Sequence, residues 1–267
     1  MLAEAYFRDG NLMGALAALQ QEIRSHPENI RYRVFLFQLL AILGQWERAL
    51  NQLEVLNGME ASTWSMARMY RDAIHCETMR ADIFAGRRKP VIFGEPTQWV
   101  ALLLESLRLL AEGQPAPASA LRNQAFELAA ESSGTIDEQP FSWIADADSR
   151  LGPVLEVILN GRYYWVPFEQ VRGINITGVE DLRDFVWLPA HFTWANGGEA
   201  YGLIPTRYPG SEAAEDSAIQ LARKTDWVEL AEGVYQGLGQ RMLATDQNDY
   251  PLLDIRRINL QNKPTEP

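Results

Sequence analysis

Residues 44–56 read GQWERALNQLEVL, and this stretch repeats the pattern of residues 10–23, GNLMGALAALQQEI. All matched positions are 34 residues apart: Gly10 with Gly44, Leu12 with Trp46, Ala15-Leu16 with Ala49-Leu50, and Leu19 with Leu53. This period is typical of tetratricopeptide arrays, in which a glycine turn joins two antiparallel helices and a small residue allows their close approach. The repeat therefore predicts stacked helix pairs.

Helical patterns continue from this repeat to about residue 131. The segment RYRVFLFQLLAIL is apolar on almost every side, which predicts a central helix. Further helices are expected at about Ser62–Gly86, with Ser62 or Thr63 as its N-cap, at Gln98–Glu112 and at Ala118–Ala130. The segment GQPAPAS predicts the turn between the last two helices, because it is rich in proline and small polar residues.

The periodicity changes after ESSGTIDEQP. The segments LEVIL and RYYWVPF flank Asn160-Gly161, which predicts a β-hairpin with an Asn-Gly turn. Further strands are expected in VRGINIT, FVWLPAHFTW, EAYGLIPTR, DWVELAEGV, GQRMLATD and PLLDIRRINL, with one short helix at 217–223. Because strands and helices do not alternate, a parallel α/β sheet is not expected. The pattern predicts a small, mostly antiparallel, barrel-like β domain.

The sequence thus predicts an α+β chain of two domains, a tetratricopeptide-like helical domain at 1–131 and a small β domain at 132–267. The helical part holds 13 basic and 15 acidic residues, and the β part holds 11 and 20, for net charges of −2 and −9. The total of −11 argues against nucleic-acid binding, which needs clustered Lys and Arg. The acidic half favours a basic or amphipathic protein partner.

The single cysteine, Cys76, excludes an internal disulfide and fits a reducing compartment. We expect it to pack within a helix rather than to act as a reactive thiol beside His75. The most apolar stretch, WVALLLESLRLLAEG, is interrupted by Glu105 and Arg108 and is too short to span a bilayer. With no signal peptide visible, the expected location is the cytoplasm, without membrane insertion.

Two aspartates one residue apart, Asp146 and Asp148, follow an apolar run in FSWIADADSR. This spacing also occurs in haloacid-dehalogenase phosphatases and metal-dependent glycosyltransferases, which makes a metal-dependent hydrolase the alternative hypothesis. Such a phosphatase needs a parallel sheet, a later lysine and an acidic pair, but only Lys224 and Lys263 follow, without an α/β unit.

We instead expect the two carboxylates to lie on one face of a strand and to be structural. They would pair with Arg150 or Arg162, or cap backbone N–H groups, at the hinge between the two domains. The substitution Asp146→Asn would then lower the stability of the protein before it affected any catalytic activity.

Other motifs lack the context that chemistry requires. Gly197-Gly198 lacks the phosphate-loop pattern and predicts a turn. The aromatic run Tyr163-Tyr164-Trp165, with Phe168, could stack a sugar or base but is typical of a core strand face.

His191 lies alone between apolar neighbours, as structural histidines do. Arg87-Arg88-Lys89 could bind phosphate, but it fits the dipole at a helix C-terminus.

These observations leave no catalytic residue, metal ligand or cofactor to assign. They favour an interaction protein whose helical array exposes a groove for a peptide or a helix. A general peptide-binding scaffold remains a second alternative.

Several long segments resemble the ImpE family, also called SciE or TagJ, of type VI secretion accessory proteins. These segments are RVFLFQLLAILGQWERALNQLEVL, FAGRRKPVIFGEP, FSWIADADSRLGPVLEVILNGRYYWVPFEQV, LRDFVWLPA, FTWANGGEAYGLIPTRYPGSE and GLGQRMLATD. The resemblance implies a tetratricopeptide-like part, a β domain and no enzymatic activity. It also implies binding to the small sheath subunit TssB through its N-terminal helix, and a link to sheath recycling by the ClpV ATPase. It assigns no individual binding residue.

Overall fold

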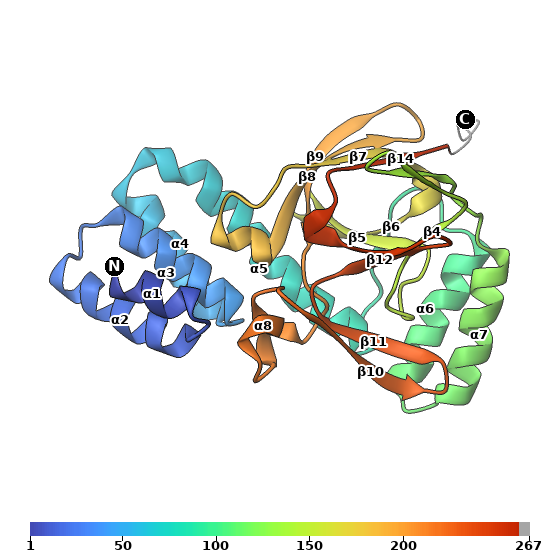
Figure 1. The fold of residues 1–267 in the computed structure, drawn as a ribbon, viewed down its shortest axis with the longest axis horizontal. Helices are drawn as coiled ribbons and strands as arrows, with labels where there is room; N and C mark the ends of the chain where they lie inside the picture. Colours follow the sequence, from blue (N-terminus) through green and yellow to red (C-terminus); the bar gives the residue numbers. More distant parts are fainter. Residues whose placement is uncertain (262–267) are drawn as a thin grey trace.

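A computed structural model describes residues 1–261. The N-terminal helices lie at one end of the molecule and the sheets, with α6 and α7, at the other, while α5 runs between them (Figure 1). The helices are α1 (Leu2–Arg8), α2 (Leu12–Ser25), α3 (Ile30–Ile42), α4 (Trp46–Met59), α5 (Trp64–Phe84), α6 (Gln98–Ala111), α7 (Pro115–Leu128) and α8 (Ser217–Gln220). No helix among these residues is long and apolar enough to cross a membrane.

The repeat in the sequence corresponds to two successive helix pairs, α1–α2 and α3–α4. Gly10 and Gly44 occupy equivalent turns with φ of +77° and +65°, a conformation that other residues adopt only at a cost. The matched alanines, Ala15 and Ala49, are completely buried. The 34-residue period therefore identified two equivalent helix pairs correctly.

The start of α7 differs from the prediction, whereas α5 has a predicted N-cap residue, Thr63. The segment GQPAPAS is not wholly a turn, because α7 begins at Pro115 rather than at Ala118. Proline is well suited to the first helical turn, where its missing N–H has no partner to lose. The long helix α5 begins at Trp64. Its N-cap residue, Thr63, makes no side-chain cap and instead donates its hydroxyl to the carbonyl of Leu56 at 2.8 Å.

The strands form three sheets. The main sheet has nine strands in the order β1-β6-β5-β9-β8-β7-β14-β2-β3, and smaller sheets pair β10 with β11 and order β13-β12-β4. The strands are β1 (Val91–Ile92), β2 (Gly134–Ile136), β3 (Gln139–Phe141), β4 (Ile144–Asp146), β5 (Val154–Leu159), β6 (Arg162–Pro167), β7 (Val171–Ile176), β8 (Trp187–Trp194), β9 (Glu199–Pro205), β10 (Thr225–Ala231), β11 (Val234–Gly239), β12 (Met242–Thr245), β13 (Asp249–Pro251) and β14 (Arg257–Leu260).

The α+β class and the mostly antiparallel pairing are confirmed. Only β1 pairs in parallel, with β6, among the described strands. The main sheet stays open within residues 1–261, because its order ends at β1 and β3, so the barrel-like expectation was too specific. The sequence predicted no strand at β1, β2 or β3, because these strands of two or three residues are too short to show a period of two.

The predicted Asn-Gly hairpin joins β5 and β6. Asn160 and Gly161 have φ of +49° and +73°, as a two-residue hairpin turn requires. All six residues of β5 are buried, because both faces of this strand are covered. Val154 and Ile158 belong to the apolar cluster of the helices, whereas Leu155, Val157 and Leu159 belong to the cluster of the other sheet face.

The helical half and one face of the sheet thus share a continuous apolar core. Helix gives way to strand between α7 and β2, within residues 129–133. The division of the chain into domains at residues 131 and 132 stays a prediction.

Candidate functional site: a buried charge network and an apolar groove

The two aspartates singled out in the sequence are both buried, at 3% and 0% exposure. Asp146 ends β4, whereas Asp148 lies in the turn beyond it, so the two do not share one strand. Asp148 accepts hydrogen bonds from Arg150 Nε (2.9 Å) and Nη2 (2.6 Å) and from the Gly237 N–H (2.9 Å). The predicted pairing with Arg150 is confirmed. Arg162, the other partner considered, is exposed.

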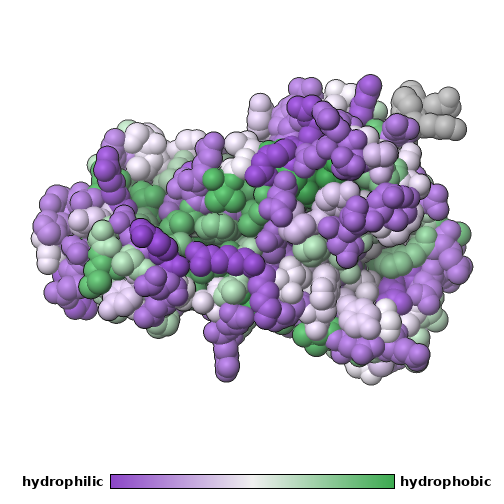
Figure 2. Space-filling view, in the orientation of Figure 1, coloured by the Kyte–Doolittle hydropathy of each residue, from purple (hydrophilic) through white to green (hydrophobic). Residues whose placement is uncertain are grey.

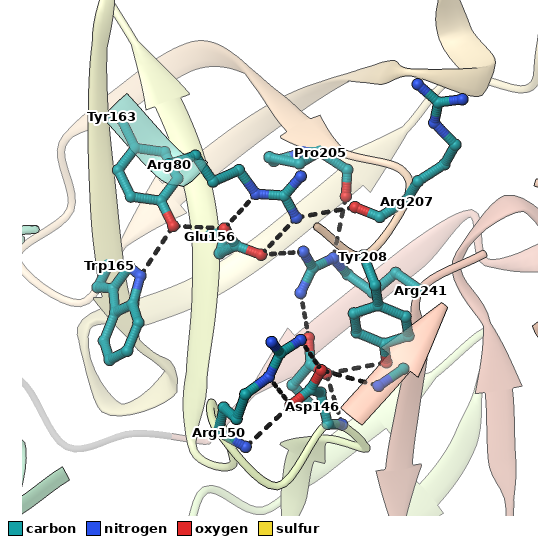
Figure 3. A network of polar contacts seen from close by, with 12 residues as sticks. Arg80, Asp146, Arg150, Glu156, Tyr163, Trp165, Pro205, Arg207, Tyr208 and Arg241 are labelled. Atoms are coloured by element: carbon teal, nitrogen blue, oxygen red, sulfur yellow. Dashed lines mark hydrogen bonds and ion pairs between the residues drawn. The ribbon is translucent and has the colours of Figure 1, made fainter. Parts of the chain in front are cut away.

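Asp146 is also fully engaged. Its carboxylate is ion-paired with Arg241, and it accepts hydrogen bonds from the Tyr208 hydroxyl and the Asp148 N–H, both at 2.9 Å (Figure 3). No group of three or more His, Cys, Asp or Glu side chains among residues 1–261 is placed to hold a metal ion. The aspartate pair therefore has the contacts of a structural element rather than those of a metal site.

Among the described residues, Lys224 does not provide the lysine that a phosphatase would need beside this pair. Lys224 forms a surface ion pair with Asp226 at 2.8 Å. Lys263 lies outside the described residues.

The network continues from Asp146 to helix α5. Arg241 also pairs with Glu156 of β5, and Glu156 accepts hydrogen bonds from Arg80 Nε (2.6 Å) and Nη2 (2.8 Å) and from the Tyr163 hydroxyl (Figure 3). These contacts link β4 to α5 through four buried side chains, in the order Asp146, Arg241, Glu156 and Arg80. We call these four residues the charge network.

Further hydrogen bonds attach the N-terminal helices to the same region. Arg80 Nη2 donates to the Arg207 carbonyl at 2.8 Å, and the Arg207 guanidinium donates to the Ile42 carbonyl, also at 2.8 Å, at the end of α3. Trp187 Nε1 of β8 donates to Glu77 Oε1 on α5 at 2.9 Å. Because these donors and acceptors come from α3, α5 and the sheet, the helices and the sheet are fixed relative to each other.

Burial and the guanidinium groups act in opposite directions on the network carboxylates. Burial favours the neutral form of Glu156, but Arg80 and Arg241 outweigh it and lower the pKa of Glu156 to about 2. Burial is dominant at Asp146 and raises its pKa to about 6, against the opposing effect of Arg241. Burial also raises the pKa of Glu77, with Arg80 opposing it. Glu156 is therefore the best-stabilised anion of these three.

Two of the other residues considered from the sequence, Trp165 and Cys76, are buried in the fold. Trp165 is completely buried and donates its indole N–H to the Tyr163 hydroxyl at 2.8 Å. Cys76 is buried, and burial raises the pKa of its thiol to about 12, so the thiolate is disfavoured. His191 is half-buried, with its Nε2 atom 3.6 Å from Glu199 Oε2 and its ring 4.6 Å from the ring of Tyr201.

The first residue of the basic run forms an ion pair, and the glycine pair lies between two strands. Arg87 pairs with Asp82 at 2.7 Å, just beyond the end of α5. Gly197 has φ of +84° in the turn between β8 and β9.

A large apolar groove lies between α5 and the sheet. It has a volume of about 1180 Å³, and Figure 2 shows a hollowed apolar area between the helical end and the sheet end of the molecule. Its apolar lining comes from α5, β5, β8 and β9: Trp64, Met69, Ile158, Pro189, Tyr201 and Leu203. Trp64, Met69 and Tyr201 are 58%, 44% and 81% exposed, which is unusual for large apolar side chains that lie together.

The charged residues of the groove come from α5. Trp64, Arg68, Arg71 and Asp72 recur at helical spacing, which places them on one face of that helix. Arg68 is exposed and Arg71 half-buried, and neither guanidinium has a hydrogen bond or ion pair with another residue of 1–261. The acidic charge of the β half favoured a basic or amphipathic partner, but the charged lining of this groove consists of two arginines and one aspartate.

The sequence contained a partial signal for this groove. The spacing of Trp64, Arg68 and Asp72 indicates one face of a helix, and Trp64 is an unusual residue to expose. The sequence does not show that this face stays uncovered, because that depends on where β9 passes. The Trp64 indole N–H donates to the Asn57 carbonyl at 2.8 Å, which fixes the ring at the groove edge.

Comparison with known proteins gives a consistent result. Residues 138–259 match a family model described as ImpE protein. The chain is 49% identical to a Pseudomonas aeruginosa protein described as type VI secretion system accessory component TagJ, over 98% of this chain and 92% of that protein. This chain belongs to the ImpE family. The resemblance seen in the sequence is thereby confirmed.

The fold of this chain also resembles that of a solved structure. The crystal structure of protein VPA1032 from Vibrio parahaemolyticus superposes with a TM-score of 0.88 at 26% identity, covering 97% of each chain. The ImpE family match contains Asp146, Glu156 and Arg241 of the charge network, whereas α5, with Arg80 and the groove arginines, precedes it.

Proposed function

We propose that this protein is a non-enzymatic accessory component of a type VI secretion system that captures an amphipathic helix in the groove. The helix proposed is the N-terminal helix of a TssB-like small sheath subunit. The observation that carries the proposal is the exposed cluster of Trp64, Met69 and Tyr201 over the buried residues Ile158 and Leu203. Support for the secretion context comes from the ImpE family and from the name of the Pseudomonas relative.

The size of the groove suits a helix. A helix 10–12 Å wide with a 5.4 Å pitch occupies about 500 Å³ per turn. The groove, at about 1180 Å³, therefore holds about two turns. The apolar face of a bound helix would cover the exposed parts of Trp64, Met69 and Tyr201, which is the helix-in-groove mode of recognition. Large aromatic residues in such positions commonly dominate binding energy.

The groove charges indicate which helix fits. Arg68 and Arg71 are one turn apart on α5 and have no partner among residues 1–261, so they would pair with acidic side chains flanking the apolar face of the ligand. These pairs set orientation and association rate more than affinity, and binding should weaken as salt rises. An amphipathic helix with acidic flanks is therefore the proposed ligand.

In this proposal the protein acts in the cytoplasm, where it would modulate sheath assembly or ClpV-dependent recycling. The rigid attachment of α5 to the sheet through Arg80 and Glu156 supports such a role, because it holds both walls of the groove in place. A pre-formed site loses less entropy when it binds a helix.

Calorimetric titration with the small sheath subunit tests the proposal. The intact subunit should bind, and a subunit lacking its N-terminal helix should not. Tyr201→Ala should weaken binding about tenfold or more, because Tyr201 is 81% exposed and has little part in the core. Tyr235→Ala on β11, outside the groove, is the matched control and should leave binding unchanged. Equal binding by the intact and truncated subunits would rule out helix capture.

A further inference from the structure

A second hollow, which we call the arginine pocket, lies on the helical side of the molecule. Its volume is about 710 Å³, and it shares no lining residue with the groove. Its apolar wall comes from α1, α3 and the short helix η3 (Leu182–Phe185): Phe7, Tyr32, Phe35, Leu182 and Phe185. Tyr32, Phe35, Leu182 and Phe185 are only partly buried, so this wall contains apolar surface open to a ligand.

Three arginines from separate segments converge on this wall. Arg8 ends α1, Arg31 lies in the first turn of α3, and Arg223 follows α8. All three are exposed, and none of their guanidinium groups has a hydrogen bond or ion pair with another residue of 1–261. Many other arginines of the chain are paired, such as Arg80, Arg108 and Arg150.

The charge of the arginine pocket is opposite to that of the whole chain. The lining contains three arginines and one carboxylate, Glu4, in a protein with a net charge of −11. Such a local reversal attracts acidic segments, whereas the net charge of −11 on each copy of this chain makes two copies repel each other at long range. Guanidinium groups are also the side chains best suited to carboxylates, because their fork matches two oxygens.

We infer that the arginine pocket binds a short acidic segment of a partner protein, with one apolar side chain of that segment seated against Phe35 and Phe185. The apolar contact would supply affinity, and the three guanidinium groups would select flanking Glu or Asp residues. This inference does not depend on helix capture in the groove.

The test uses the full chain and a fluorescein-labelled peptide of about ten residues, with four glutamates around a central Leu-Phe pair. Fluorescence anisotropy should show binding that weakens about tenfold when Arg31→Glu or Arg223→Glu is introduced. It should also weaken as sodium chloride rises from about 50 to about 500 mM. A peptide with glutamines in place of the glutamates should bind at least about tenfold more weakly.

Arg172→Glu is the matched control, because Arg172 is exposed on β7 and lies outside both hollows. Any of three results would overturn the inference. The glutamate and glutamine peptides could bind equally well, Arg172→Glu could lose as much affinity as the pocket variants, or the glutamate peptide could fail to bind the unmodified protein. Sedimentation that reveals a dimer abolished by Arg31→Glu would also overturn it, because the pocket would then be a contact between copies. Binding of the sheath subunit should be the same in Arg31→Glu as in the unmodified protein, which separates this test from that of the groove.

Discussion

Arg80 on α5 donates two hydrogen bonds to Glu156 on β5, of 2.6 and 2.8 Å, and both side chains are buried. This pair joins the helix that forms one wall of the groove to the sheet that forms the other. A bidentate pair of this kind is geometrically specific, because two parallel bonds fix the guanidinium plane against the carboxylate. The relative position of the two walls therefore depends on it.

Glu156→Gln should lower the free energy of unfolding by about 3 kcal/mol, because it leaves Arg80 and Arg241 without their shared anion. Asp146→Asn should cost less, about 1–2 kcal/mol, because burial already raises the pKa of Asp146 and so disfavours its anion. Urea unfolding at pH 7 measures both values. A larger loss for Asp146→Asn would contradict the order of the two carboxylates.

Stability should depend on pH in two separate windows. Because the pKa of Glu156 is lowered to about 2, its stabilisation is present above pH 4.5 and is lost as pH falls from about 4.5 towards 2. Because the pKa of Asp146 is raised to about 6, its contribution falls as pH rises from about 3.8 to 6. Urea unfolding from pH 3 to pH 7 should show the difference between Glu156→Gln and the unmodified protein shrinking below about pH 4.5. A constant difference would exclude this assignment.

Gly44→Ala should destabilise the protein by about 1–2 kcal/mol, because Gly44 has φ of +65° and a Cβ there would lie 2.5 Å from Glu212 Cγ. The control is Gly58→Ala in α4, where a Cβ meets no atom within 4 Å. That change should stabilise the protein by about 0.5–1 kcal/mol, since alanine favours helix. Thermal or urea unfolding of both variants checks the pair, and equal effects would argue against the glycine-turn assignment.

Adding Mg²⁺ or Mn²⁺ should leave the melting temperature unchanged. The Asp146 and Asp148 carboxylates already form ion pairs with Arg241 and Arg150 and accept hydrogen bonds from backbone N–H groups. A metal ion would therefore have to displace buried arginines. A thermal shift assay with and without metal, on the unmodified protein and on Asp146→Asn, measures this. A metal-dependent rise that disappears in Asp146→Asn would revive the hydrolase hypothesis.

The parts of the fold predicted from sequence are those with a local signal. The helix pairs follow from the 34-residue repeat, and the β5–β6 hairpin follows from Asn160-Gly161 between two apolar runs. The strand β1, by contrast, has only two residues and exists because it pairs with Tyr164 and Trp165 of β6. Such strands depend on distant partners, and no periodicity within them indicates their state.

The same distinction applies to the site. The sequence indicated that Asp146 and Asp148 are structural and suggested Arg150, which is two residues from Asp148. It did not indicate Arg241 or Arg80, because 95 residues separate Asp146 from Arg241 and 76 separate Arg80 from Glu156. The groove depends on similar long-range placement, since the order of strands in the sheet brings Tyr201 into the same groove as Trp64.

Binding of the isolated N-terminal helix of the sheath subunit tests the central claim most directly. A fluorescently labelled peptide of that helix should bind the unmodified protein. The double variant Arg68→Glu, Tyr201→Ala should weaken the affinity for this peptide by about a hundredfold. The control variant Arg88→Glu, outside the groove, should leave the affinity unchanged. Unaltered affinity in the Arg68→Glu, Tyr201→Ala protein would show that the helix does not bind in this groove.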